Sequence, residues 1–266
     1  MPSRRKISIA ERRLRQVLVR GVGGPAYLSG VARLVFGAET RMRRSLPIQR
    51  YCHGAGVEIG AAASPAIVPF GVKVGYVDKY PLDVISADPE LTGLVPVTPD
   101  FICSAEKLEE LDDQSQDFVL AFSLLEHVQD PIGALESFVR VTKDGGVAIL
   151  TVPDKRKYKP DQKRPLTTFD HLLRDYEEGP AWSLECHLRE SALLHIGMSE
   201  AEAEEFVVQT KAMDGHTHFH VWDPASFMSF VHRTKDRLGL PVELLEFAQY
   251  GHETLVVLRV DRRATP

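Results

Sequence analysis

Cysteine is scarce in this sequence of 266 residues, and long apolar runs are missing. Its three cysteines, Cys52, Cys103 and Cys186, are widely spaced and odd in number. This usage excludes a disulfide framework and a thiolate zinc site, and it favours a reducing compartment, so we expect a cytoplasmic location. No stretch reaches the ~18–20 apolar residues of a membrane helix, and the charged N-terminal residues contain no apolar signal region, so we expect neither a membrane span nor a secretion signal.

Aromatic residues are few among the first 50 residues, although this segment is strongly basic. Residues 1–50 hold twelve Lys/Arg and two Asp/Glu, a net charge of +10, so the formal charge of −5 leaves −15 for the remainder. A basic arm can bind nucleic acid, anionic lipid or a phosphorylated carrier, but it can equally dock on the acidic body as a solvated helix face. Because interleaved aromatics are absent, nucleic acid is the weaker reading.

From residue 57 onward, short apolar runs alternate with helical stretches. Such runs, bounded by Gly, Asp or Pro, are typical of strands buried on both faces of a parallel sheet, and their alternation with helices favours right-handed βαβ units. The expected strands cover residues 57–60, 74–78, 100–104, 117–123 and 146–153, with a final antiparallel pair near 242–248 and 253–260. The expected helices cover residues 8–20, 26–44, 131–142 and 224–237. The sequence therefore predicts an α/β fold with a Rossmann-like sheet, N-terminal helices and an inserted cap.

The polar, His-containing stretch after the fifth strand interrupts this alternation and divides the chain. We expect an N-terminal helical arm, a cofactor-binding core, an acceptor-binding cap, and a C-terminal helix and strands that complete the core. Their ranges are 1–50, 51–153, 154–222 and 223–266. The N-terminal helices could also mediate a homodimer.

A turn of small residues follows the first expected strand in the run Gly56-Val57-Glu58-Ile59-Gly60-Ala61-Ala62-Ala63-Ser64-Pro65. Small side chains let a ligand approach the backbone closely, at the sheet edge where open α/β folds bind ligands. Asp78 ends the next strand and can accept hydrogen bonds from both hydroxyls of a ribose. The turn lacks G-x-G-x-x-G, and Glu58 would repel a pyrophosphate, so a cationic sulfonium ligand fits better than a dinucleotide.

Five motifs in order, VEIGAAASP, YVD, SAEKLEEL, DFVLAFSLLEHVQDP and VTKDGGVAILTVP, resemble the class I methyltransferases of the small-molecule kind often called type 11. The resemblance spans about residues 56–153 and implies S-adenosylmethionine as the cofactor. It implies that Glu58, Gly60 and Ala61 line the methionine part and that Asp78 holds the ribose. It also places Ser104, Ala105 and Glu106 beside the adenine, and Phe122 and Ser123 on the sulfonium side.

The sequence departs from this family at several positions. Ser104 stands where the family usually has Asp, which puts the contact to the adenine amino group in doubt, and Ser123 stands where His is common. In some quinone O-methyltransferases a Glu-x-x-Glu-His arrangement at this place binds a metal. Because Ser123 replaces the first Glu, we interpret Glu126-His127 as a structural feature of a helix start. No Asp/Asn-Pro-Pro-Tyr/Phe motif follows the fourth strand, which counts against methylation of nucleic-acid bases.

The segment after the fifth strand, with HTHFHVWDP at 216–224, resembles bacterial sugar O-methyltransferases of polysaccharide biosynthesis, among them those of methylated mycobacterial polysaccharides. We therefore expect methyl transfer to a hydroxyl of a sugar or oligosaccharide acceptor. A phenol or quinone acceptor is the alternative within the same enzyme class. A nicotinamide-dependent oxidoreductase is the alternative from another class, and a cofactor-binding scaffold without catalysis is a third.

A sugar hydroxyl is a poor nucleophile at neutral pH, so its methylation needs a general base or a metal that lowers its pKa. The candidate side chains are Asp and His residues in and after the fifth strand. Asp154, His171, His187 and His220 are the predicted catalytic residues. The predicted ligands of Mg²⁺ or another divalent metal are Asp154, His171 and His218. Asp175 is a further candidate because it lies one helical turn after His171.

Overall fold

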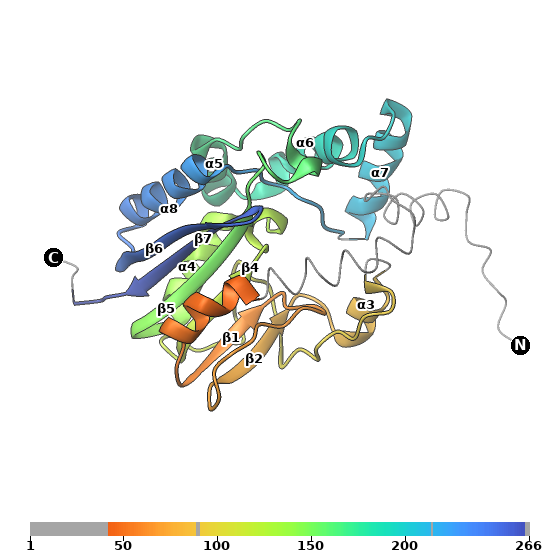
Figure 1. Cartoon of the computed structure of the whole chain (residues 1–266). Coiled ribbons are helices and arrows are strands. Elements are labelled where there is room, and N and C mark those ends of the chain that lie inside the picture. Colours follow the sequence, from red (N-terminus) through yellow and green to blue (C-terminus); the bar gives the residue numbers. More distant parts are fainter. Residues whose placement is uncertain (1–41, 89–90, 214, 264–266) are drawn as a thin grey trace, which may run out of the picture.

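The computed structural model describes residues 42–88, 91–213 and 215–263. It contains a seven-stranded sheet in the order β3-β2-β1-β4-β5-β7-β6 (Figure 1). The pairs β1–β2, β1–β4, β2–β3 and β4–β5 are parallel, whereas β7 runs antiparallel to both β5 and β6. The expected Rossmann-like sheet with an antiparallel end is therefore confirmed. The helices expected at 8–20 and, for the most part, at 26–44 lie outside the described residues.

The strands follow the predicted apolar runs closely. They are β1 (Ala55–Ile59), β2 (Lys73–Asp78), β3 (Phe101–Ile102), β4 (Gln116–Phe122), β5 (Thr142–Pro153), β6 (Val242–Tyr250) and β7 (Glu253–Val260). The strand expected at 100–104 is shorter than predicted, because only two of its residues pair with β2. Six of the seven strands begin within two residues of the predicted start, and β5 begins four residues earlier than predicted.

Apolar side chains of the central strands alternate between two cores, as the period of two in a strand requires. Phe118, Leu120 and Phe122 of β4 join one apolar cluster. This cluster also contains Ile48, which lies in the helical residues 42–51, and Cys52, which directly follows them. Val119 and Ala121 join the larger cluster on the opposite face. The sheet is therefore covered on both faces, as the continuous apolar runs predicted.

Three helices pack on the face opposite residues 42–51. They are α4 (Pro131–Val141), α5 (Phe169–Glu178) and α8 (Pro224–Leu238) (Figure 1). The predicted start of α4 is confirmed: Pro131 occupies its first turn, and the Asp130 carboxylate accepts the Gly133 N–H at 2.9 Å. The short α3 (Leu82–Ser86) follows β2. No helix in the described part of the chain is both long and apolar enough to cross a membrane.

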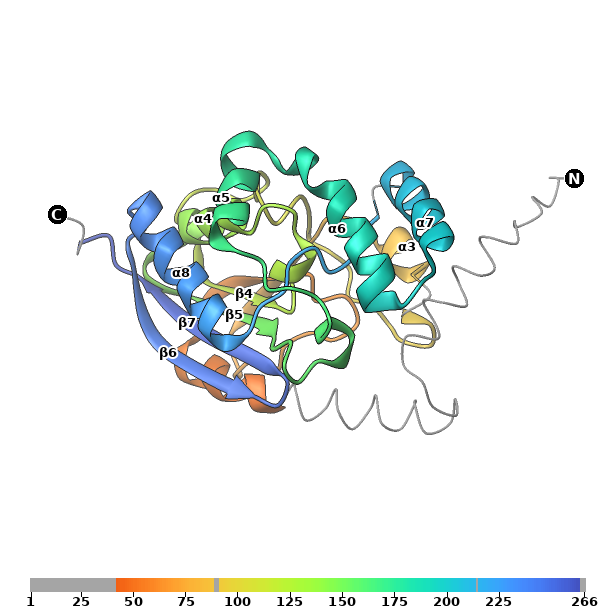
Figure 2. The same cartoon turned by 90° about the horizontal axis from the view of Figure 1, so that it is seen from above.

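A helical segment lies between β5 and α8, in the range expected for the cap. Besides α5 it contains η3 (Lys159–Asp161), η4 (Pro180–Trp182), α6 (Leu184–Glu190), the π-helix η5 (Ser191–Ile196) and α7 (Glu200–Ala212). It has a small apolar cluster of its own, to which Leu188, Ala203 and Phe206 contribute. Seen from above, α7 lies over α3, and α6 lies between α7 and the centre of the molecule (Figure 2).

Candidate functional site

A tight turn after β1 begins the site. Gly60 has φ +68° and Ala62 has φ +45°, both in the left-handed region. The left-handed backbone at residue 60 favours glycine, and a Cβ atom there would also come to 3.0 Å from the Leu124 side chain. The turn keeps the end of β1 open toward a cavity.

This cavity has a volume of about 550 Å³ and lies across the carboxyl ends of β1, β2 and β4. That is the edge where open α/β sheets bind ligands. The predicted cofactor residues that line it are Gly60, Asp78, Ser104, Ala105, Glu106 and Ser123. Among the described residues, Glu58, Ala61 and Phe122 are predicted cofactor residues that do not belong to its wall.

Asp78 ends β2 and contributes a carboxylate to the cavity wall. Its Oδ1 accepts the Tyr80 N–H at 3.1 Å. Burial raises its pKa, and its backbone hydrogen bonds and the nearby His216 act in the opposite direction. A half-buried carboxylate with acceptor capacity left over suits a ligand that offers two adjacent hydroxyl groups.

Glu58 lies beneath the turn, where it supports the chain that follows. Its side chain is buried, and Oε2 accepts the Ala66 N–H at 2.9 Å. Burial raises the pKa of Glu58 to about 7, against the opposing effects of that hydrogen bond and of Arg44. The carboxyl group therefore ties residue 66 back to β1, and it offers a charge that a cationic ligand would favour.

Glu106 connects the end of β3 to the loop after β4. Its Oε1 accepts the N–H groups of Gln129 at 2.8 Å and Asp130 at 3.0 Å. Its Oε2 accepts the Ser104 hydroxyl at 3.2 Å. Ser104 is thus engaged with its neighbour, and the two side chains together shape the cavity wall where the resemblance predicts an adenine.

Ser123 follows β4 in a left-handed conformation, with φ +49°. Its hydroxyl donates to Glu253 Oε1 at 2.9 Å, and the Arg44 guanidinium pairs with the same carboxylate. Arg44 also lies 4.7 Å above the Phe122 ring. Ser123 itself has no charge where some relatives have Glu. A buried carboxylate from β7, that of Glu253, therefore lies next to this residue.

None of the four predicted catalytic residues lines the cavity, as far as the described residues define its wall. Asp154 is buried and paired with Arg156, whose Nε and Nη2 lie 2.9 and 2.8 Å from its two oxygens. Burial alone would raise the pKa of Asp154, but the hydrogen bonds from Arg156 outweigh burial and lower it. Asp154 is therefore an ionised carboxylate with its own cation.

The histidines among these residues form a second group. His171 Nε2 lies 2.8 Å from His187 Nε2, and the His187 ring centroid lies 4.9 Å from that of His220. Burial, followed by His171, lowers the pKa of His187 to about 4, and burial also lowers that of His220 well below its usual range. His220 Nε2 donates to the carbonyl of Gln129. Gln129 lines the cavity and His220 does not, so the three histidines contact the cavity wall through this hydrogen bond.

The three predicted metal ligands do not meet in one cluster. His171 groups with Asp175 and His187, whereas His218 groups with Asp161 and His195 and also with Glu126 and His127. Asp154 belongs to none of these groups. The structure therefore distributes the predicted ligand set over three places.

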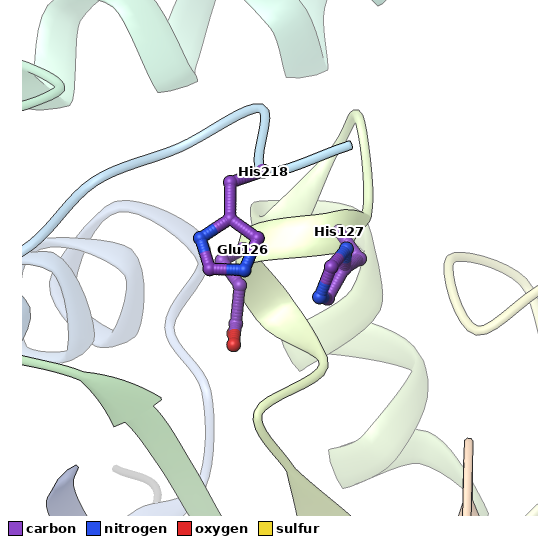
Figure 3. Close-up of side chains that lie close together, drawn as sticks. All are labelled: Glu126, His127 and His218. Atoms are coloured by element: carbon purple, nitrogen blue, oxygen red, sulfur yellow. The ribbon is translucent and has the colours of Figure 1, made fainter. Parts of the chain in front are cut away.

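Glu126, His127 and His218 converge beside the cavity (Figure 3). His127 lines the cavity, and its Nδ1 donates to the Thr217 carbonyl at 3.1 Å. His218 Nδ1 lies 2.8 Å from Asp161 Oδ2. In both rings the Nδ1 atom is therefore engaged in a hydrogen bond, which leaves Nε2 to face the cluster. Both carboxylate oxygens of Glu126 are buried without a hydrogen-bond partner. One ligand atom from each of the three residues lies within 4.8 Å of the others.

Burial governs the charges of this cluster. It raises the pKa of Glu126 well above the usual range, and the neighbouring Glu253 and Asp161 add to that effect. Burial lowers the pKa of His127 well below its usual range, assisted by His218 and His216. At neutral pH the His127 imidazole is therefore uncharged, with a lone pair available for a proton.

Asp161 organises the same region from η3. Its carboxylate accepts hydrogen bonds from His195 Nδ1 and His218 Nδ1, both at 2.8 Å, and from Arg164 at 3.2 Å. Although burial would raise the pKa of Asp161, the hydrogen bonds and charges of His195 and His218 hold it well below its usual range. An ionised Asp161 fixes the His218 tautomer, as carboxylates behind functional histidines commonly do.

Sequence reasoning did not assign functional roles to Glu126, His127, His216 or Asp161. For Glu126 and His127 a signal was present, because the pair directly follows the fourth strand at the ligand-bearing edge. Both lie in η2 (Leu125–His127), ahead of α4. No signal in the sequence singles out Asp161, whose partners His195 and His218 are 34 and 57 residues away.

Comparisons with known proteins agree with this geometry. Residues 74–150 match the family model described as a methyltransferase domain. Solved structures similar to this chain include an S-adenosylmethionine-dependent methyltransferase from Aquifex aeolicus, with 13% identity, a TM-score of 0.47, and coverage of 90% of this chain and 100% of that one. Another comes from Thermotoga maritima and is described as a possible histamine N-methyltransferase, with 18% identity, a TM-score of 0.43, and coverage of 79% and 84%. A search of curated protein sequences finds no significant match.

The family match spans the strands β2 to β5, which carry Asp78 and the wall residues 104–106 and 123. The order of the seven strands, with β7 antiparallel between β5 and β6, is that of the class I methyltransferase sheet. The described sheet therefore has the Rossmann-like class I fold, and residues 74–150 match a methyltransferase domain, the family that uses S-adenosylmethionine.

Proposed function

We propose that this methyltransferase acts on a hydroxyl of a sugar or oligosaccharide in polysaccharide biosynthesis, and that His127 takes the proton of that hydroxyl. The observation that carries the proposal is the position of His127. Its imidazole lines the cofactor cavity beyond the end of β4, and the Thr217 carbonyl holds its Nδ1–H. The Nε2 lone pair is thus free to accept a proton.

The cavity residues divide between the cofactor and the acceptor in this proposal. The turn at Gly60 approaches the methionine part, Asp78 accepts from the ribose hydroxyls, and residues 104–106 border the adenine. In the reaction the acceptor oxygen attacks the sulfonium methyl in line, the S–CH₃ bond breaks as the O–CH₃ bond forms, and His127 receives the hydroxyl proton. Holding the reacting atoms in line supplies much of the acceleration.

Polar groups near His127 favour a sugar over a flat apolar acceptor. Ser123, Gln129 and His216 line the same cavity as His127. They can donate to and accept from a ligand that carries many hydroxyl groups, whereas a quinone would leave most of them without partners. Leu124 and Phe219 in the same wall can pack on the apolar C–H face of a sugar ring.

A divalent ion at Glu126, His127 and His218 is a second way to activate the hydroxyl. The donor set fits, because Glu126 presents a buried carboxylate without a hydrogen-bond partner and two imidazole nitrogens converge on it. When bound, such an ion would lower the pKa of an acceptor hydroxyl. In this proposal Asp154, His171, His187 and His220 shape and support the wall and do not touch the acceptor.

The test is methyl transfer from labelled S-adenosylmethionine to a panel of mono- and oligosaccharides, catechols and quinones. We expect transfer to a glycan hydroxyl and a loss of about 10²–10⁴-fold in kcat for His127→Gln, the usual contribution of a general base. The affinity of His127→Gln for S-adenosylmethionine should equal that of the wild type, since in this proposal the His127 ring faces the acceptor and not the cofactor. The matched control is His232→Gln, an exposed residue of α8, which should keep full activity.

Three outcomes separate the alternatives. Transfer to a catechol but to no glycan would remove the sugar assignment. Activity that falls with a chelator, returns with Mg²⁺ or Mn²⁺, and is lost in Glu126→Gln would assign the cluster to a metal. Unchanged turnover in excess chelator would leave His127 as the base acting alone.

A further inference from the structure

A second cluster of ligand-type side chains lies between two helices of the inserted segment. His171 and Asp175 are one turn apart on α5, and His187 lies on α6. His171 Nε2 is 2.8 Å from His187 Nε2 and 3.2 Å from Asp175 Oδ2. One ligand atom from each residue lies within 4.8 Å of the others, and none of the three residues lines the cofactor cavity. The cluster is thus separate from the site of methyl transfer.

The hydrogen bonding of this cluster is incomplete. Asp175 is 0% exposed, and its Oδ1 accepts the Ser183 hydroxyl at 2.6 Å. Its Oδ2 has no well-directed hydrogen bond, and the ring nitrogen at 3.2 Å is shared with His187. Among the described residues, no Lys or Arg forms an ion pair with Asp175. A buried carboxylate oriented toward two imidazole nitrogens is costly unless a positive charge joins it.

We propose that His171, Asp175 and His187 bind a divalent transition-metal ion, Zn²⁺ in the first instance, through two imidazole nitrogens and one carboxylate oxygen. Two His and one carboxylate form a common three-residue zinc set, and imidazole favours Zn²⁺ over Mg²⁺ or Ca²⁺, which prefer oxygen. Ligand atoms around tetrahedral zinc lie about 3.3 Å apart for bonds of about 2.0–2.1 Å. The distances of 2.8 and 3.2 Å need only a small widening to admit the ion.

Groups around the cluster hold it ready for a ligand. Ser183 orients Asp175, as hydrogen-bond partners behind metal ligands do. The Phe219 backbone carbonyl accepts a hydrogen bond from the His187 ring. His171 is 26% exposed at its side chain and provides the route of entry. The ion would fasten α5 to α6, and through His220 and its bond to the Gln129 carbonyl the assembly contacts the wall of the cofactor cavity.

The experiment is a zinc titration of the full-length chain after chelator treatment, in competition with a chromophoric chelator. We expect one tight site per chain, and at least 100-fold weaker binding in both Asp175→Asn and His187→Ala. His218→Ala is the matched control: it removes a ligand shared by the two other His-carboxylate clusters and should leave the tight site in place. A wild-type chain without a tight site, or a site lost in His218→Ala and kept in Asp175→Asn, would overturn the proposal.

Cobalt substitution and a milder variant guard against misfolding as the explanation. Co²⁺ bound to the wild type should give the visible absorption bands of a tetrahedral nitrogen–oxygen site, and His187→Ala, folded by circular dichroism, should not. Ser183→Ala keeps all three ligands and should weaken zinc binding about 10-fold, as the loss of an orienting partner does. Equal zinc affinity in Ser183→Ala and a Co²⁺ spectrum unchanged by His187→Ala would both count against this site. These readouts do not depend on the acceptor or on catalysis.

Discussion

Glu58, at the residue scale, is a carboxyl group buried beneath the cofactor turn, where burial raises its pKa from 4.5 to about 7. The folded chain therefore holds a proton that the unfolded chain releases above pH 4.5. This contribution to stability is complete below pH 4.5 and is lost as the pH rises through about 7. Over that interval we expect the unfolding free energy of the wild type to fall by about 3 kcal/mol more than that of Glu58→Gln. Urea denaturation at a series of pH values measures the difference.

The glutamine variant keeps an oxygen that can accept the Ala66 N–H, so only the titration is removed. Glu204→Gln, exposed on α7, is the control and should retain the wild-type pH profile. Parallel pH profiles for the wild type and Glu58→Gln would show that Glu58 ionises normally in the folded chain. S-adenosylmethionine is cationic and should favour the ionised form, so it should reduce the difference at neutral pH.

At the scale of single elements, α8 depends on a reciprocal cap at its N-terminus. The Asp223 carboxylate accepts the Ser226 N–H at 2.8 Å, and the Ser226 hydroxyl lies 2.9 Å from the Asp223 N–H as its acceptor. Because four N–H groups at a helix start have no partner within the helix, we expect Asp223→Ala to lower the unfolding free energy by about 1 kcal/mol. Asp236→Ala, exposed near the end of the same helix, should change it by less than about 0.5 kcal/mol. Equal urea midpoints for the two variants would contradict the capping role.

At the scale of the whole molecule, cofactor binding should couple to global stability. A ligand that binds only the folded chain adds about 2.7 kcal/mol at a concentration 100 times its Kd. We expect S-adenosylmethionine to raise the melting temperature, and we expect Asp78→Ala to weaken its binding about 10–100-fold, since hydrogen bonds to a charged group contribute about 1.5–3 kcal/mol. Calorimetry and thermal shift measure both quantities. Asp83→Ala, exposed in the first turn of α3, should bind as the wild type does.

A different ligand response would change the assignment of the cavity. Stabilisation by NAD(P) without stabilisation by S-adenosylmethionine would contradict the role given to Asp78 and the Gly60 turn. An unchanged cofactor Kd in Asp78→Ala would place the ribose elsewhere.

The fold was largely predictable because it depends on local patterns. The apolar runs at 57–60, 74–78 and 117–123 became β1, β2 and β4, and Pro131 marked the start of α4. The cofactor side of the site was predictable for the same reason. Gly60 and Asp78 lie where strands end, and the carboxyl ends of parallel strands meet at one edge of the sheet. The prediction for β3 was too long, because pairing with β2 and not local composition decides where an edge strand stops.

The sequence alone determined the α/β class, the order of the strands along the chain and the residues of the small-residue turn, because periodicity and turn chemistry act over a few neighbours. Only the tertiary structure decided which histidines meet. His218 pairs with Asp161 and approaches His127, whereas His171 pairs with His187, and Asp154 pairs with Arg156. These partners come from separate elements, so their meeting depends on how the inserted helices pack over the sheet, a property that no local pattern encodes.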